Sequence, residues 1–430
     1  MRAIITVGLG FGDEGKGATV DFLTRTLGAD LVVRYSGGAQ AGHNVQLADG
    51  RRHTFSQFGA GALAGANTYL GPRMIMSPAT MVPEADHLIG LGVANPWSTI
   101  SVHPECLVTT TYHMMMNRLR EVARGDDRHG SCGLGFGEAR HYWLRYGHDA
   151  IFAENLGDGS VLKSKLNLMR DRFLIEMQEL GTIDPESAGI LRSHSPGSEA
   201  TELRRDSEQL GINSAMPHAE TVIFEGSQGV LLDEWKGFHP YTTWSTVTPQ
   251  HALEMLDEVE GYEPVIEKTV VGITRAYSTR HGAGPFPAFC PRMTTEMVDR
   301  GNPRNDWQGA IRFGPLDLVL LEYSARVCNV DSIFVNGIDE LPERPRVIQQ
   351  YQKTERLNEP ASLEEQEALT KALLDVEPSF VETTTKGLLD RIDQIAPVCG
   401  VSRGPRSDDR EMVPFHRSNT TKEVLERAVV

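Results

Sequence analysis

The stretch that decides the fold lies near the start of the chain and reads Gly8-Leu9-Gly10-Phe11-Gly12-Asp13-Glu14-Gly15-Lys16-Gly17-Ala18. The apolar run before it, residues 3–7, predicts a buried strand, and residues 19–23 after it have helical spacing. A strand, a glycine loop and a helix in this order point backbone N–H groups and a helix N-terminus at a phosphate. The spacing from Gly10 to Gly15 and Lys16 is that of a phosphate-binding P-loop.

This loop departs from an ordinary P-loop in two ways. Gly17 stands where a serine or threonine would supply a hydroxyl ligand for Mg²⁺, and two carboxylates, Asp13 and Glu14, lie inside the loop. A carboxylate in a phosphate loop is repulsive unless a cation sits there or the residue takes part in the chemistry. Asp13 is therefore a candidate metal ligand, a candidate general base, or both. A plain glycine-rich turn is the alternative interpretation, but the lysine, the acid and the preceding strand favour the phosphate loop.

The composition limits the class of protein. The chain has 430 residues, of which 40% are hydrophobic and 23% charged, as expected for a soluble globular protein of one to three domains. A net charge of −16 argues against nucleic acid or an anionic membrane surface as the main partner, although it does not exclude nucleotides. The five cysteines include no CxxC pair, so we expect reduced thiols in a cytoplasmic protein. We expect no secretion signal and no transmembrane helix.

Two more glycine-rich segments have the composition of ligand loops. Residues 35–44 follow a predicted strand at 30–34 and contain Gln40, Ala41, Gly42 and His43, at a position where open α/β sheets bind ligands. Residues 128–138, with Ser131 and Cys132, are too irregular for a dinucleotide fingerprint, and we expect a loop that covers a ligand. Cys132 as a nucleophile has no evident partner residue in the sequence.

Later strands also end in polar residues. The strand at 221–224 leads to Gln228, which could read an amide or carbonyl edge, and Thr243 could hold a phosphate oxygen; an ordinary turn is equally compatible. The strand at 269–274 leads to a glycine-containing segment with Arg280 and His281. Arg304, in a polar loop at 297–309, suits carboxylate capture, with a solvated charged loop as the alternative.

The last ligand candidates lie near the C-terminus. The strand at 332–335 ends in Asn336-Gly337-Ile338-Asp339, and a carboxylate there can accept hydrogen bonds from N1–H and the 2-amino group of guanine, which would select GTP over ATP. Residues 398–405 predict a strand and a loop that could flank a base. Helices are expected at 83–91, 161–180, 316–327, 364–374 and 384–395.

We therefore predict an α/β, P-loop-like fold with a large central, mostly parallel sheet flanked by helices and long ligand-binding loops. Residues 1–430 are expected to form a single domain with a helical, polar insertion at about 155–218.

Taken together, these loops resemble the adenylosuccinate synthetase family, the GTP-dependent ligases that join L-aspartate to C6 of IMP. The matching segments run over nearly the whole chain: 12–17, 37–43, 224–229, 240–243 and 278–287, with weaker echoes at 336–339 and 402–405.

The resemblance implies a mechanism and a set of site residues. Asp13 would take the N1 proton of the 6-oxopurine, His43 would assist γ-phosphoryl transfer to O6, and Asp13 with the Gly42 carbonyl would hold Mg²⁺. The catalytic residues would be Asp13, His43, Lys16 and Gln228, and the amino-acid substrate would be bound by Arg304 and Arg312. Nucleotide binding would fall to Gly12, Asp13, Glu14, Gly15, Lys16, Gly17, Gln40, Ala41, Gly42, His43, Ser131, Cys132, Gln228, Thr243, Arg312, Asn336, Asp339, Ser402 and Gly404. The family is also homodimeric and serves AMP biosynthesis in the cytoplasm, with small-molecule partners and neither nucleic acid nor membrane.

Departures from the family pattern cluster around the substrates. The altered positions include Ser131, Cys132 and Leu134 in place of a threonine pair and an arginine, Gln40 for asparagine, His281 for valine, and Gly337 for lysine; Arg312 alone is kept from an arginine cluster. Three hypotheses follow: a synthetase acting on IMP and aspartate, a paralogue with the same chemistry on another purine nucleotide (GMP or dGMP) or another amine, and a non-catalytic GTP-binding regulatory protein. Phage-type synthetases tend to lack the catalytic aspartate, which this chain keeps, and a mere binder has no use for a base beside the γ-phosphate.

Overall fold

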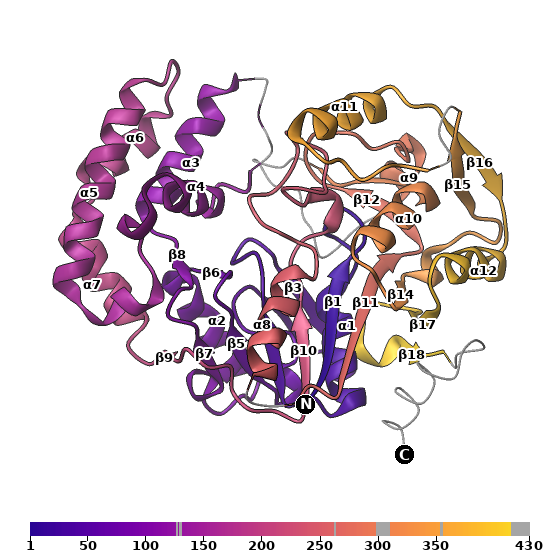
Figure 1. The fold of residues 1–430 in the computed structure, drawn as a ribbon, viewed down its shortest axis with the longest axis horizontal. Helices are drawn as coiled ribbons and strands as arrows, with labels where there is room; N and C mark the ends of the chain where they lie inside the picture. The colour runs from indigo at the N-terminus through magenta and orange to yellow at the C-terminus, as the bar shows by residue number, and fades with distance from the viewer. Residues whose placement is uncertain (126–127, 129–130, 262–263, 298–309, 353–355, 414–430) are drawn as a thin grey trace.

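A computed structural model describes residues 1–125, 128, 131–261, 264–297, 310–352 and 356–413 (Figure 1). Its centre is a ten-stranded sheet in the order β18-β17-β14-β11-β1-β10-β2-β5-β7-β9, parallel throughout except for the pair β17–β18. The strands are β1 (Arg2–Gly8), β2 (Leu31–Arg34), β5 (Asn67–Leu70), β7 (Ile100–Val102), β9 (Gly211–Ile212), β10 (Thr221–Glu225), β11 (Glu267–Arg275), β14 (Ser332–Asn336), β17 (Val398–Ser402) and β18 (Arg410–Met412). The predicted α/β fold with a large, mostly parallel sheet is confirmed.

The sheet separates two hydrophobic cores, because successive side chains of a strand point to opposite faces. Ile4 of β1 belongs to one core with α1 (Lys16–Leu27), whereas Ile5 belongs to the other with α8 (Gln250–Glu260), α10 (Leu318–Val327) and α12 (Thr385–Ile395). Strands buried on both faces read as continuous apolar runs, which is why residues 3–7 and 221–224 were recognisable in the sequence.

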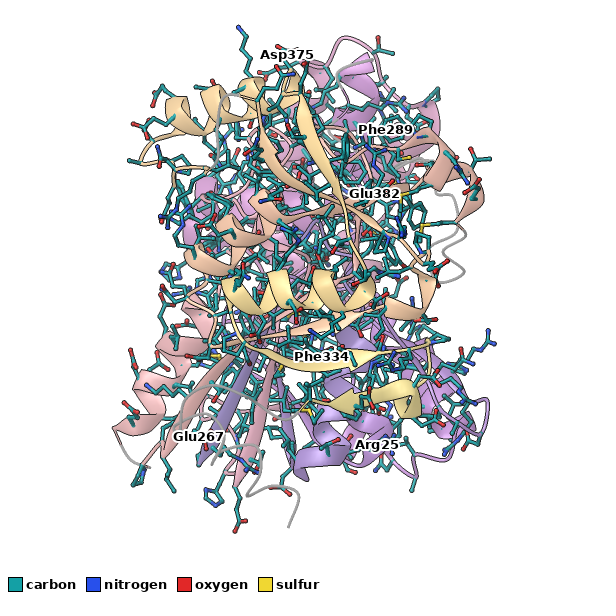
Figure 2. All side chains as sticks on the ribbon, turned by 90° about the vertical axis from the view of Figure 1, so that its right-hand side faces the viewer. Arg25, Glu267, Phe289, Phe334, Asp375 and Glu382 are labelled. Atoms are coloured by element: carbon teal, nitrogen blue, oxygen red, sulfur yellow. The ribbon has the colours of Figure 1, made fainter. Side chains whose placement is uncertain are left out.

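A second sheet, in the order β12-β13-β15-β16, was not foreseen. It consists of β12 (Tyr277–Arg280), β13 (Arg312–Asp317), β15 (Arg346–Tyr351) and β16 (Pro378–Glu382), and Figure 2 shows Glu382 of β16 above Phe334 of the main sheet. The predicted helix at 316–327 begins only at Leu318, because β13 continues to Asp317. The Asp317 carboxylate accepts the N–H groups of Val319 and Leu320, both at 3.1 Å, and so caps the helix.

A helical arm stands to one side of the main sheet, on the left of Figure 1. It contains α3 (Thr111–Ala123), α4 (Phe136–Tyr146), α5 (Gly159–Gln178), α6 (Pro185–Ser193) and α7 (Pro196–Asp206). The arm's apolar side chains, such as Leu162 and Phe173, belong to the same core as Ile4 of the sheet. This shared core supports the proposal that residues 1–430 form one domain, with 155–218 as an insertion.

The remaining elements are short or peripheral. They are the pairs β3 (His43–Gln46) with β4 (Arg52–Phe55) and β6 (Ile75–Met76) with β8 (Leu107–Val108), and the helices α2 (Pro78–Gly90), α9 (Pro291–Glu296) and α11 (Leu363–Leu374). The helix expected at 83–91 begins earlier, because Pro78 rather than Pro83 occupies the first turn, where a missing N–H costs nothing. Within the described residues, no helix is long and apolar enough to cross a membrane.

Helix α2 holds the segment that follows β4 through one buried carboxylate. Glu84 accepts the backbone N–H groups of Ser56 at 2.9 Å, Gln57 at 2.9 Å and Phe58 at 3.1 Å. Because β4 pairs with β3, these hydrogen bonds also brace the hairpin whose first residue is His43.

We expect Glu84→Gln to destabilise the fold by about 1–3 kcal/mol, since the amide replaces an acceptor oxygen by a donor facing backbone N–H groups. The midpoint of thermal unfolding measures the change. Asp86→Asn, at an exposed position of the same helix, is the control. An equal midpoint for Glu84→Gln and Asp86→Asn would contradict the bracing role.

Candidate active site

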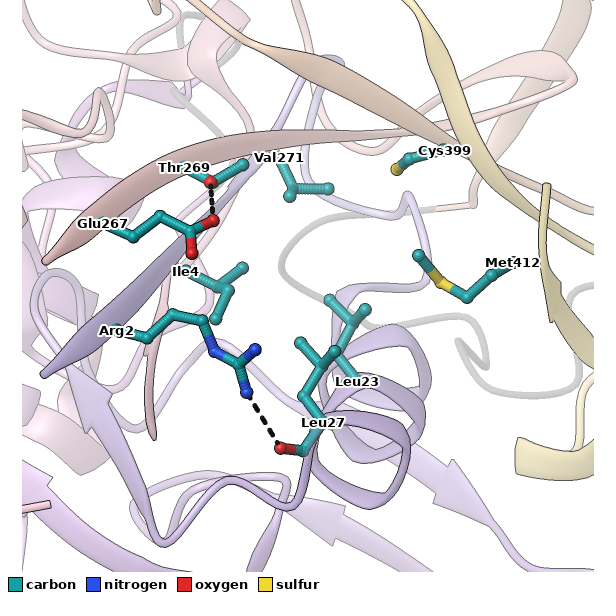
Figure 3. A pocket seen from close by; sticks show the side chains of 9 residues that line it. All are labelled: Arg2, Ile4, Leu23, Leu27, Glu267, Thr269, Val271, Cys399 and Met412. Atoms are coloured by element: carbon teal, nitrogen blue, oxygen red, sulfur yellow. Dashed lines mark hydrogen bonds between the residues drawn. The ribbon is translucent and has the colours of Figure 1, made fainter. Parts of the chain in front are cut away.

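Two cavities within the described part of the chain are too small for a nucleotide. The cavity between β1, β11 and α1, lined by residues such as Ile4, Leu23 and Cys399, has a volume of about 10 Å³ (Figure 3). Another, behind the phosphate loop and lined partly by Phe11 and Asp317, has about 30 Å³. Such volumes hold roughly one or two water molecules. Open α/β sheets bind their ligands at the carboxyl ends of the strands, and the predicted ligand loops lie there.

The predicted phosphate loop joins β1 to α1 and has a carboxylate at its centre. The Glu14 side chain accepts the N–H groups of Gly10 at 3.0 Å and Gly12 at 2.7 Å, and it pairs with the Lys16 ammonium at 2.6 Å. Lys16 also donates to the Gly12 carbonyl at 2.9 Å, and both charged side chains are buried. Lys16 of the same loop is therefore the cation that offsets the negative charge of Glu14.

The missing P-loop hydroxyl has a packing explanation. A Cβ atom on Gly17 would lie 2.7 Å from Cβ of His43 and 2.8 Å from its carbonyl carbon, closer than real Cβ contacts. The second glycine loop thus presses His43 against the first turn of α1. Serine or threonine at position 17 is incompatible with His43 at this place.

His43 is held by a buried network. Its Nδ1 lies 2.5 Å from Oε1 of Glu225, the last residue of β10, while Oε2 accepts the Ala60 N–H at 2.9 Å and lies 4.0 Å from Nε of Arg34. Burial lowers the pKa of the His43 imidazole to about 4, against the opposing influence of Glu225. Burial acts to raise the pKa of Glu225, but Arg34, His43 and the Ala60 N–H outweigh it and hold that pKa below its usual value. A neutral His43 therefore donates from Nδ1 to Glu225.

That arrangement leaves Nε2 of His43 as an acceptor. Nε2 is buried and finds no hydrogen-bond partner within the described part of the chain. Buried polar atoms without partners are rare in folded proteins, so this nitrogen points to a ligand.

Asp13 is partly buried and remains accessible to a ligand. Its side chain is 18% exposed, and Oδ2 lies 3.8 Å from Nε2 of His281. Burial raises the pKa of the Asp13 carboxyl above its usual value; His281, Arg275 and Lys16 oppose that effect and Glu14 adds to it. Arg275 also donates from Nε to the Asp13 carbonyl and so fixes the backbone. A carboxylate with a raised pKa is a better proton acceptor.

The predicted base-reading residues adjoin the phosphate loop. Gln228 has a left-handed backbone with φ 61° and donates from Nε2 to Thr243 Oγ1 at 2.8 Å. Oε1 of Gln228 and Oε1 of Gln40 are both buried without a hydrogen-bond partner among the described residues. A Cβ on Gly37 would lie 2.5 Å from Cβ of Ser227, so the second glycine loop touches the turn that carries Gln228.

The segment with Ser131 and Cys132 is anchored to the helical arm. Ser131 donates its hydroxyl to Asn117 of α3 at 2.8 Å, and burial raises the pKa of the Cys132 thiol, which disfavours a thiolate nucleophile. Phe136, expected in a loop, is instead the first residue of α4, and its ring packs so closely on Gly38 that a Cβ there would lie 1.9 Å away. The segment therefore lies beside the second glycine loop, with the Ser131 hydroxyl turned towards α3.

The predicted guanine-binding residues lie at the ends of the neighbouring strands β14 and β17. Asn336 donates to the Glu14 carbonyl at 2.9 Å and to Thr19 Oγ1 at 3.0 Å, so its amide fastens the strand to the phosphate loop. Ser402 accepts the Gly337 N–H at 3.0 Å, which joins the two loops, and Asp339 is exposed. Gly404 packs beside Asp409, whose Oδ2 would lie 2.4 Å from a Cβ at position 404.

Of the two predicted amino-acid ligands, Arg304 lies outside the described residues. Arg312 donates from Nη2 to the Gly282 carbonyl at 2.6 Å and to that of Gly284 at 3.5 Å, and its guanidinium lies 5.4 Å from the centre of the Phe286 ring. Its main contacts thus hold the turn that follows His281.

The donor set suits Mg²⁺. A carboxylate and a backbone carbonyl are hard oxygen ligands, and Asp13 and Gly42 offer these at the phosphate loop, since Gly42 directly precedes the His43 that packs on Gly17. Mg²⁺ bound there would neutralise phosphate charge.

Comparison with known proteins identifies the family. The family model described as adenylosuccinate synthetase matches residues 5–392. The chain belongs to the adenylosuccinate synthetase family. It is therefore a GTP-dependent ligase that forms a C–N bond. An adenylosuccinate synthetase from Neisseria gonorrhoeae is 28% identical over 96% of this chain and 99% of the relative, and one from Limosilactobacillus reuteri is 31% identical over 79% and 77%.

Solved structures confirm the fold. A fully ligated adenylosuccinate synthetase from Plasmodium falciparum superposes with a TM-score of 0.75 at 18% identity, covering 96% of this chain and all of that one. The succinoaminodeoxyadenylate synthetase of cyanophage S-2L, bound to dGMP and to dATP as an energy donor, gives 0.60 at 18% identity, covering 100% and 98%.

Several contacts of the site were missed by sequence reasoning. Glu225 lay in a recognised motif, but nothing in the sequence showed that its carboxylate is buried. Nor did the sequence show the contact of Arg34 with Glu225 or that of Arg275 with Asp13. His281 was noted as part of a glycine-containing segment and as a departure from valine, but not as a neighbour of Asp13. Its approach to Asp13 depends on how the chain passes from β11 of the main sheet to β12 of the second sheet, which no local pattern encodes.

Gly17→Ser would restore the hydroxyl of an ordinary P-loop, yet we expect kcat to fall by about tenfold or more, because the new side chain displaces His43. Steady-state phosphate release measures the effect. Gly90→Ser, at a helical glycine with open space around it, should leave kcat unchanged. An undiminished kcat for Gly17→Ser would refute the packing explanation.

Glu225→Gln keeps the shape of the side chain but no longer fixes the proton of His43 on Nδ1. We expect kcat to fall by about a hundredfold with little change in KM for GTP. Glu199→Gln is a matched control, since it disturbs another Glu–His pair, with His194, in the helical arm. Equal effects of the two variants would show that the loss comes from general destabilisation.

Proposed function

We propose that this chain phosphorylates O6 of a 6-oxopurine nucleotide with GTP and then replaces the phosphate by the amine of an amino acid, with IMP and L-aspartate giving adenylosuccinate as the family's reaction. The observation that carries the proposal is the combination of Asp13, with its raised pKa, on the phosphate loop and a neutral His43 that packs against Gly17 at the end of that loop. A loop that only binds GTP needs neither group.

The steps follow from this placement. The N1 proton passes to Asp13 while O6 attacks the γ-phosphorus, and the bond to the β–γ bridging oxygen breaks, releasing GDP. The amine then adds to C6, loses a proton, and the C6–O bond breaks to release phosphate. Phosphoryl transfer depends mainly on positioning and charge neutralisation, which Lys16 and Mg²⁺ at Asp13 and Gly42 would supply. Gln228 and Thr243 would orient the acceptor nucleotide.

The donor would bind at the ends of β14 and β17. Asp339, exposed at this point, would accept hydrogen bonds from N1–H and the 2-amino group of guanine, beside Ser402 and Gly404. Arg312, with Arg304, would serve the amino-acid carboxylates. We further propose a cytoplasmic homodimer in AMP biosynthesis; Leu144 of α4 and Ile175 of α5 are 55% and 62% exposed, an apolar surface that a second copy could cover.

A second candidate is the same chemistry on a guanine nucleotide. Two observations favour it: the cyanophage relative is bound to dGMP, and a hydrogen-bonding residue, His281, stands beside Asp13 where the family pattern has valine.

Phosphate release from GTP and Mg²⁺ tests the function, with IMP, GMP and dGMP each paired with aspartate and with other amino acids. We expect turnover with at least one pair and a loss of about a hundredfold or more in Asp13→Asn, which cannot accept the N1 proton. Mass spectrometry identifies the product. GTP binding without turnover for any pair would favour a regulatory protein instead.

A further inference from the structure

His281 is a polar residue that faces the proposed base and that the proposed reaction does not use. Its Nε2 lies 3.8 Å from Oδ2 of Asp13, and its side chain is only 15% exposed. The other ring nitrogen, Nδ1, is buried and has no hydrogen-bond partner in the described ranges. No structural hydrogen bond among the described residues explains why a histidine occupies this position.

The side chains that hold His43 and the Asp13 backbone come from strands on opposite sides of β1. β1 lies between β10 and β11 in the main sheet. His43 is bound to Glu225 at the end of β10, whereas His281 follows β11 and β12 along the chain. Arg275, the last residue of β11, binds the Asp13 carbonyl, so the β11 side of the loop is in direct contact with Asp13.

The turn that carries His281 is fixed from several directions. Gly282 and Gly284 have φ values of 71° and 103°, and Arg312 donates to both of their carbonyls. The buried Arg280 donates to the Ala283 carbonyl at 2.6 Å and to that of Pro285 at 2.8 Å. His281 is therefore preorganised, as a residue that discriminates between ligands must be.

The covalent structure of a 6-oxopurine turns this placement into a prediction. N1 lies between C6 and C2, so a base whose N1–H faces Asp13 and whose O6 faces the phosphate loop and His43 directs C2 to the opposite side. We propose that His281 contacts the substituent at C2 and selects an acceptor nucleotide with a polar group there, the 2-amino group of guanine or the 2-oxo group of xanthine, over hypoxanthine. This inference rests on the proposed function, because Asp13 must face N1.

Histidine suits either group, since a neutral imidazole offers one donor and one acceptor nitrogen. Hypoxanthine has only a C2–H, which would leave the imidazole desolvated and unpaired. A site built to hydrogen-bond a substituent discriminates strongly against an analogue that lacks it. The valine of the family pattern, by contrast, can pack against the C2–H of hypoxanthine without leaving a polar group unpaired.

The test compares two substitutions at one position. His281→Val introduces the residue of the family pattern, whereas His281→Gln keeps a donor and an acceptor near the place of Nε2. For each protein, kcat/KM is measured with IMP, GMP and XMP at saturating GTP, Mg²⁺ and amino acid. The unmodified chain should prefer GMP or XMP to IMP by about tenfold or more. His281→Val should abolish this preference through a higher KM for the 2-substituted nucleotide, and His281→Gln should retain most of it.

Binding of the three nucleotides, measured by calorimetry with GDP and Mg²⁺ present, gives a second readout that needs no turnover. If no acceptor supports phosphate release, the proposed function fails; His281 is then tested by whether GMP or XMP binds more tightly than IMP and whether His281→Val removes the difference. Turnover with IMP as the preferred acceptor, or an unchanged preference in His281→Val, would overturn the inference and leave the proposed function standing. Separate measurements with GMP and with XMP show whether the imidazole accepts a hydrogen bond from the 2-amino group or donates one to the 2-oxo group.

Discussion

The site depends on one buried ion pair inside the phosphate loop, between Glu14 and Lys16. Two charges are costly to bury unless each is paired and hydrogen-bonded, and here the loop's own N–H groups at Gly10 and Gly12 complete the carboxylate's partners. The pair therefore fixes the curvature of the loop, and the loop in turn places Asp13. Because Asn336 binds the Glu14 carbonyl, the strand that leads to the proposed guanine pocket is fastened to the same residue.

A second constraint is the close packing of His43 on Gly17. It explains the absence of the P-loop hydroxyl in the sequence as the space that His43, a proposed catalytic residue, requires. The hydroxyl's function as a metal ligand then has to come from other oxygens, and Asp13 with the Gly42 carbonyl would supply them. The lack of a side chain at Gly17 therefore allows the position of His43 and leaves the proposed role of metal ligand to Asp13.

The parts that could be predicted from sequence were those with a local pattern. The continuous apolar runs of β1 and β10 and the glycine spacing of the phosphate loop placed the main sheet and its first ligand loop correctly. The second sheet escaped notice because its strands are only four to six residues long and are spread over residues 277–382 of the chain. Contacts such as His43 with Glu225, separated by 182 positions, follow from the strand order, which residue patterns alone do not fix.

The distribution of these residues over the strands suggests how one scaffold can change its substrate. The groups proposed to move protons and phosphate sit on the loops after β1 and β2 and are secured by β10, through Glu225. Most residues that depart from the family pattern lie elsewhere: His281 after β12, Ser131 to Leu134 ahead of α4, and Gly337 after β14, whereas Gln40 shares the loop after β2. A substitution at His281 would change the side chain that is proposed to face C2 of the base. It would leave the Glu14–Lys16 pair and the His43–Glu225 contact in place. Under the proposed function, the residues for substrate choice and those for phosphoryl transfer therefore lie largely on different loops, and Asp13 borders both groups.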